Sequence, residues 1–178
     1  MGAELNIDLQ RFADNLAVIK RRVAPAEVML VVKNDAYGHG VSRIAERAVA
    51  AGIRSFGTFD AATALTVREV VGPKPRIFAW NVEDESAVAQ ALRANIELGV
   101  GNLDYLELVA QAATTAGVVA RVHLKIDTGL HRNGFLAEQW PLALDRALLH
   151  SLAGAVRVVG VWSHLAETSD PDDDDARA

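Results

Sequence analysis

The sequence predicts a parallel α/β fold built from repeated strand–helix units. Short apolar runs alternate with amphipathic stretches along the chain. One of these runs, Val28–Val32, is apolar at every position, which is typical of a strand buried on both faces. The stretches between the runs have the length and the apolar spacing of helices of about 10 to 15 residues. Strands joined by helices in this way form right-handed βαβ units and a parallel sheet.

The elements follow in order from the amino terminus. Glu4–Asp8 is strand-like, and Leu9–Arg22 has helical spacing. Asp60 is the expected N-cap of a helix that continues to Val71. The other predicted strands are Val28–Val32, Ser55–Phe59, Arg76–Trp80, Ile96–Val100, Val118–Ile126 and Val156–Ser163, and the other predicted helices are Val41–Ala51, Glu83–Ala94, Leu103–Ala116 and Leu136–Ser151.

This order fits two architectures. A TIM-type (β/α) barrel needs eight such units and usually about 250 residues, so a chain of 178 residues would form an incomplete barrel. A doubly wound sheet is the alternative. No GxGxxG sequence follows the first core strand, which disfavours the dinucleotide-binding form of that fold.

The composition excludes several classes of function. A net charge of -5 and a pI near 5.5 disfavour nucleic acid and anionic membranes as partners. The absence of cysteine excludes disulfides and thiolate metal sites, and we expect no metal. No secretory signal or long apolar segment is visible, so we expect a soluble cytoplasmic protein. The acidic tail Ser169–Ala178 is expected to form a solvated loop.

The segment VVKNDAYGHG carries the first candidate site residue. Lys33 follows an apolar strand, and the carboxyl ends of barrel strands are where active sites lie. Burial there favours the neutral amine that forms a Schiff base. The alternative is a lysine that simply leaves the strand for solvent. Gly38 and Gly40 permit a tight turn after it.

The segment RVHLKIDTGLHRNGF carries the second group. Its aliphatic residues alternate with His123, Lys125 and Asp127, so one face of the strand is polar. An interior lysine there must be paired, neutralised or modified. Arg132 follows the strand and is suited either to an oxygen anion or to a surface ion pair.

The segment VRVVGVWSHLAE carries the third candidate. His164 lies at the carboxyl end of an apolar strand, where either a structural or a functional role is open. We expect Trp162 to belong to the core. Lys33, Lys125, Arg132 and His164 together describe a cationic, partly aromatic pocket suited to an anionic aromatic cofactor.

These segments resemble the alanine racemases, which are fold-type III pyridoxal-phosphate enzymes. VVKNDAYGHG resembles the family signature, and LKIDTGLHRNGF, SHLAETSDPDDD and the opening ELNIDLQRFADNL resemble further blocks in the same order. Asn34 stands where the family usually has a small residue. The resemblance covers essentially the whole chain and implies an incomplete TIM-type barrel over residues 1–178, the amino-terminal cofactor-binding domain, without the family's carboxy-terminal β-domain.

The resemblance also implies the role of each residue. Lys33 is the Schiff-base lysine and one of two catalytic bases. Tyr37 contacts the cofactor on its phosphate side, and Arg132 hydrogen-bonds its phenolic oxygen. Lys125 matches a lysine that is carbamylated in some members. His164 lines the pyridine ring.

The implied reaction is racemisation of L-alanine and D-alanine, which supplies D-alanine for cell-wall peptidoglycan. Family members are homodimers, and the second base is a tyrosine from the partner subunit's carboxy-terminal domain. The only tyrosines here are Tyr37 and Tyr105, so we expect this chain alone to be inactive or weakly active. The alternatives are a serine racemase, an amino-acid decarboxylase, a small single-domain cofactor-binding protein and a non-catalytic cofactor-binding fragment.

Overall fold

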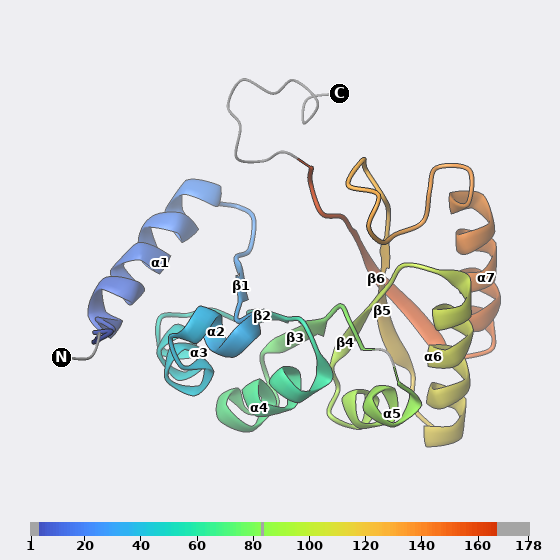
Figure 1. Ribbon diagram of the computed structural model, residues 1–178. Helices are drawn as coiled ribbons and strands as arrows, with labels where there is room; N and C mark the ends of the chain where they lie inside the picture. Colours follow the sequence, from blue (N-terminus) through green and yellow to red (C-terminus); the bar gives the residue numbers. More distant parts are fainter. Residues whose placement is uncertain (1–3, 83, 167–178) are drawn as a thin grey trace. The chain divides into compact units, whose positions relative to one another are not determined.

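The structure is a computed structural model that describes residues 4–82 and 84–166. The acidic tail for which a solvated loop was predicted lies outside these residues. The described residues form two compact units (Figure 1). The first unit runs to Val82 and includes Ala94–Ile96, and the second comprises the described residues of Glu83–Arg93 and Glu97–Ala178.

The first unit holds three parallel strands in the order β1-β2-β3. Leu30 lies opposite Phe56 in the register, and Phe56 lies opposite Ile77. Helix α4 packs on β2 and β3, and α3 packs on α4. The elements are α1 (Leu9–Val23), β1 (Met29–Val31), α2 (Lys33–Gly38), α3 (Val41–Ala50), β2 (Ser55–Thr58), α4 (Ala61–Val71) and β3 (Arg76–Ala79).

The second unit holds the parallel strands β4-β5-β6. Helices α6 and α7 lie on the same side of β5 and β6 (Figure 1). The register shifts between Val122 and His123, and the partner of His123 is Gly160, where a Cβ atom would lie 2.5 Å from the imidazole. The elements are α5 (Glu85–Arg93), β4 (Glu97–Val100), α6 (Leu103–Ala116), β5 (Ala120–Lys125), α7 (Trp140–Leu152) and β6 (Val156–Trp162).

The predicted strands and helices after residue 8 are confirmed, with ends that shift by a few residues. The strand predicted at Glu4–Asp8 is wrong. A strand requires a backbone partner, and none of the described strands pairs with this segment. Asp8 instead caps α1, because its carboxylate accepts hydrogen bonds from the amides of Gln10 and Arg11. Within the described ranges, no helix is both long and apolar enough to cross a membrane.

Arg68, near the end of α4, binds four backbone carbonyls in the first unit. Its guanidinium donates to Gly72 and Pro75 at 2.8 and 2.9 Å, and to Ala94 and Asn95 at 3.0 and 2.9 Å. Partial burial lowers the pKa of Arg68. These bonds join the end of α4 to the segment Ala94–Ile96 and explain why that segment belongs to the first unit.

We expect the Arg68→Ala variant to lower the free energy of unfolding by about 2–3 kcal/mol, because four carbonyls lose a charged donor. The Arg68→Lys variant keeps the charge but not the planar fork, so it should recover only part of this loss. Urea denaturation of the purified chain measures both values. Arg43→Ala, on the exposed side of α3, is the control. Equal stability of Arg68→Ala and Arg43→Ala would contradict the prediction.

Candidate functional site

The predicted site residues lie at or just after the carboxyl ends of strands in both units. In the first unit β1 ends at Val31, the amide of Val32 still donates to Gly57 at 2.8 Å, and Lys33 follows with a half-buried side chain. In the second unit Lys125 is the last residue of β5, and His164 lies two residues beyond the end of β6. The strand-end positions inferred from the sequence are confirmed in each unit.

The residues that follow Lys33 form a left-handed turn, labelled α2. The φ angles of Asn34, Asp35, Ala36 and Tyr37 lie between 52° and 56°. Each L-residue in this region costs about 1–2 kcal/mol, although asparagine and aspartate tolerate it better than most residues. The turn therefore depends on hydrogen bonds that offset this cost.

Two side chains and the backbone supply such bonds. The carboxylate of Asp35 accepts a hydrogen bond from the amide of Val41 at 2.7 Å. The backbone carbonyl of Asp35 accepts one from the amide of Gly40 at 3.0 Å. The imidazole of His39 donates from Nδ1 to the carbonyl of Ala36 at 2.8 Å. The resulting turn places the Tyr37 ring beside Lys33, with Nζ 5.8 Å from the ring centroid. Tyr37 itself is 57% exposed.

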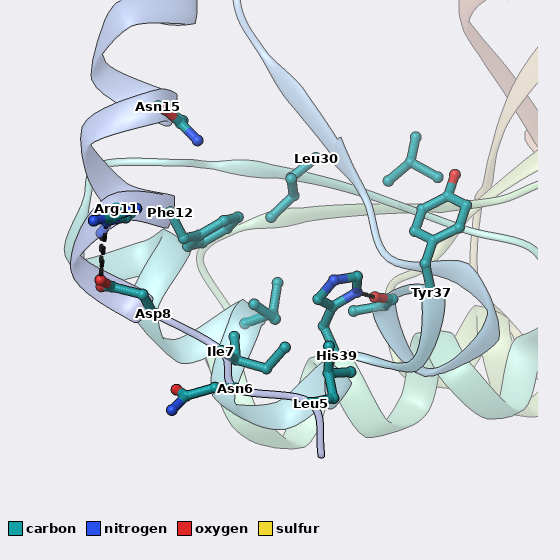
Figure 2. A pocket seen from close by; sticks show the side chains of 13 residues that line it. Leu5, Asn6, Ile7, Asp8, Arg11, Phe12, Asn15, Leu30, Tyr37 and His39 are labelled. Atoms are coloured by element: carbon teal, nitrogen blue, oxygen red, sulfur yellow. Dashed lines mark hydrogen bonds and ion pairs between the residues drawn. The ribbon is translucent and has the colours of Figure 1, made fainter. Parts of the chain in front are cut away.

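A cavity of about 520 Å³ lies next to this turn in the first unit. Its walls come from the segment before α1, from α1, β1 and α3, and from the turn. Figure 2 shows Phe12 from α1 and Leu30 from β1 pointing towards one another across it, with His39 and Tyr37 on the side of the turn. The ion pair between Asp8 and Arg11, at 3.4 Å, lies on the side of α1.

The second unit brings together a lysine and two aromatic rings. Lys125 is 4% exposed, and its Nζ lies 4.9 Å from the centroid of the Trp162 indole. His164 packs edge-on against Trp162, with ring centroids 5.1 Å apart. Burial lowers the pKa of Lys125, the positive charge of Arg132 lowers it further, and Asp127 raises it. Trp162, predicted as a core residue, is half-buried and forms a platform for the other two side chains.

The loop that carries Arg132 is folded by its own polar groups. Asp127 accepts from the amides of Gly129 and His131 at 3.0 and 3.1 Å. The bond from His131 is the main reason that the pKa of Asp127 lies below its usual value. The Ser163 hydroxyl donates to the carbonyl of Ile126 at 2.8 Å, which joins this loop to the end of β6. Arg132 is exposed.

A buried carboxylate at the other end of β4 was not recognised from the sequence. Glu97 is 2% exposed, and its Oε1 accepts two bonds from Arg121 at 2.7 and 3.0 Å. Its Oε2 lies 2.7 Å from Nε2 of His123. The only sequence signal was a glutamate inside the apolar run Ile96–Val100. Glu97 and Arg121 lie at the amino ends of β4 and β5, which in barrels serve stability. We therefore assign these two residues and the His123 that they contact through Glu97 to the framework.

Comparison with known proteins identifies the family. A family model described as "Alanine racemase, N-terminal domain" matches residues 7–178. The alanine racemase of Beutenbergia cavernae is 44% identical over 164 residues, which are 92% of this chain and 43% of that protein. The solved alanine racemase of Streptomyces lavendulae has a TM-score of 0.92 and 34% identity, over 96% of this chain and 44% of that one.

A histidine racemase from Leuconostoc mesenteroides also matches, with a TM-score of 0.84 and 26% identity, over 95% of this chain and 45% of that one. The chain thus spans less than half the length of the relatives it matches. These likenesses confirm the predicted fold class, which is the amino-terminal part of the alanine racemase (β/α) barrel. The chain belongs to the family of alanine racemase amino-terminal domains.

Proposed function

We propose that this chain is the cofactor-binding part of an amino-acid racemase that uses pyridoxal phosphate to interconvert L-alanine and D-alanine. The observation that carries the proposal is Lys33, a half-buried primary amine at a strand end, held beside the Tyr37 ring within the family's signature segment. The product of this reaction would be D-alanine for cell-wall peptidoglycan. The protein would act as a homodimer on a free amino acid.

The chemistry of the side chains fits the cofactor. Pyridoxal phosphate is an anionic aromatic aldehyde, so its site needs an amine, cationic or hydroxyl donors and a flat apolar surface. Lys33 supplies the amine, and Tyr37 and Arg132 supply donors. His164 supplies an aromatic ring that Trp162 holds in place. By the family resemblance, each of these residues would contact pyridoxal phosphate.

The residues divide the work of racemisation. The cofactor, when bound, withdraws electrons from the α-carbon of the amino acid and so acidifies its proton. The amine of Lys33 then accepts or returns that proton at Nζ. When the cofactor is bound, Arg132 would donate a hydrogen bond to its phenolic oxygen. Carbamylation would convert Lys125 from a costly buried cation into an anion that attracts Arg132, whose charge already acts on Lys125.

A second base must act on the opposite face of the amino acid, because inversion returns the proton on the other side. Tyr37 is assigned to the cofactor. Tyr105 lies in the first turn of α6, its hydroxyl is buried, and burial raises its pKa. We therefore propose that the second base comes from outside these 178 residues, and that the chain alone is inactive or weakly active.

A racemase for another amino acid is the second candidate. The matching histidine racemase shows that this fold also occurs in an enzyme named for a larger substrate. Racemisation assays of the full-length homodimer with alanine, serine and histidine separate the two candidates. Alanine should give the highest kcat/KM.

We expect pyridoxal phosphate, followed by borohydride, to label Lys33 selectively in the purified chain. The other lysines are Lys20, Lys74 and Lys125, so peptide mass mapping locates the adduct without ambiguity. The Lys33→Arg variant should lose the adduct, because a guanidinium does not form the covalent linkage. The Lys74→Arg variant changes an exposed loop lysine and should label like the wild type. Equal labelling of Lys33 and Lys74 would refute the proposal.

We expect the Lys125→Met variant to report the charge state of Lys125. A lysine whose pKa is lowered by folding binds its proton less readily in the folded state. While it is protonated, Lys125 therefore lowers the free energy of unfolding. This loss becomes smaller as the pH rises from the pKa of Lys125 in the folded state towards the ordinary pKa of lysine. Lys125→Met should thus raise the free energy of unfolding at pH 7 by about 1 kcal/mol or more.

The gain in the free energy of unfolding should shrink as the pH approaches the ordinary pKa of lysine, about 10.4. Thermal unfolding of the wild type and of Lys125→Met at several pH values, without bicarbonate, measures this difference in stability. A destabilising effect of Lys125→Met that appears only with added bicarbonate would show the carbamylated form. Destabilisation at every pH without bicarbonate would contradict the assignment of Lys125 as a costly cation.

A further inference from the structure

The carboxylate of Asp35 has a place that the family resemblance does not explain. It accepts a hydrogen bond at 2.7 Å from Val41, the first residue of α3. The residue before α3 is Gly40, which has no side chain to cap the helix. Asp35 therefore supplies the cap from within the left-handed turn and ties that turn to α3.

The tie determines where Tyr37 lies relative to Lys33. L-residues prefer right-handed or extended conformations, so the turn Asn34–Tyr37 would relax if its bonds were lost. A change of hand at these positions would point the Tyr37 ring in another direction. The bond from His39 to Ala36 closes the same turn at its other end, but it does not reach α3. Within the part of the chain that the structure describes, the bond from Val41 to Asp35 joins a side chain of the turn to α3.

We propose that Asp35 is a positioning residue, which holds the left-handed turn against α3 and thereby keeps the Tyr37 ring beside the amine of Lys33. The effect of Asp35 on cofactor binding rests on the proposed function. The effect of Asp35 on the position of the Tyr37 ring does not, and the two effects can be measured separately.

The geometric effect can be measured without cofactor. Reductive methylation with ¹³C-formaldehyde labels the lysines of the purified chain, and the Lys33→Arg variant identifies the Lys33 resonance in a ¹H–¹³C NMR spectrum. An amine 5.8 Å from an aromatic centroid experiences a ring-current shift, which the Tyr37→Leu variant abolishes. We expect Asp35→Ala to move the Lys33 resonance to its Tyr37→Leu position. Asp35→Asn keeps a side-chain oxygen acceptor and should preserve the wild-type resonance.

A matched control is available in the same unit. Asp60 caps α4 through Thr63, also at 2.7 Å, and lies outside the turn. Asp60→Ala removes the same kind of bond and should leave the Lys33 resonance unchanged. An unchanged resonance in Asp35→Ala would overturn the proposal. Equal displacement in Asp35→Ala and Asp60→Ala would also overturn it, because the effect would then be a general loss of stability.

The second readout uses pyridoxal phosphate below saturation, followed by borohydride and peptide mapping. We expect Asp35→Ala to reduce the Lys33 adduct about fivefold, the size of effect that loss of a helix cap has on an equilibrium, with Asp35→Asn near wild type. A displaced resonance with an undiminished adduct would overturn the role towards the cofactor. A displaced resonance with no Lys33 adduct even in the wild type would support the positioning role and refute the proposed function.

Discussion

Parallel pairing of the strands is the constraint on which the rest of each unit depends. Within a unit, parallel strands end at the same edge of the sheet, and the chain must leave each strand there by a loop. Backbone amides in such loops have no sheet partner and must be satisfied in another way. Asp127 and Ser163 satisfy an amide and a carbonyl at the ends of β5 and β6, and Asp35 satisfies the first amide of α3. The candidate site residues stand on or beside the same loops, so their placement follows from how the sheet ends.

Strand β5 shows how one strand serves both the framework and the site. Arg121, His123 and Lys125 alternate along it and share one face. Both oxygens of the Glu97 carboxylate are engaged by the first two residues. Lys125 forms no ion pair within the described ranges and lies against the Trp162 ring instead. Burial and the charge of Arg132 lower the pKa of Lys125, so this amine gives up its proton more readily than an exposed lysine does. Lys125 lies at the carboxyl end of the strand, where barrel enzymes place their chemistry.

The sequence was sufficient for the features that follow from periodicity. The apolar run before Lys33 and the alternation around Lys125 identified both strand ends, and Leu103–Ala116 matches α6 at both ends. The strand at Glu4–Asp8 failed because strand formation depends on a partner, which local pattern does not reveal. The hand of the turn after Lys33 was equally inaccessible, because it opposes the local preference of L-residues and depends on bonds to His39 and Val41. The buried position of Glu97 depends on the distant Arg121.

The two units share one further feature, which concerns rigidity. Lys33 and Lys125 are each followed two residues later by an aspartate whose carboxylate accepts hydrogen bonds from backbone amides. Asp35 accepts from the first residue of α3, and Asp127 accepts from two amides of the loop that carries Arg132. Non-glycine residues with positive φ occur in both segments, Asn34 to Tyr37 in the first and His131 in the second. Hydrogen bonds of their own polar groups help to hold both segments, and Tyr37 and Arg132 are exposed. The Tyr37 ring, which lies beside Lys33 while still exposed, would lose little conformational entropy when a ligand binds. This explains why the strained turn is worth its cost in stability. The strain lies in the backbone, where the carboxylate of Asp35 can offset it, and the side chain of Tyr37 stays exposed.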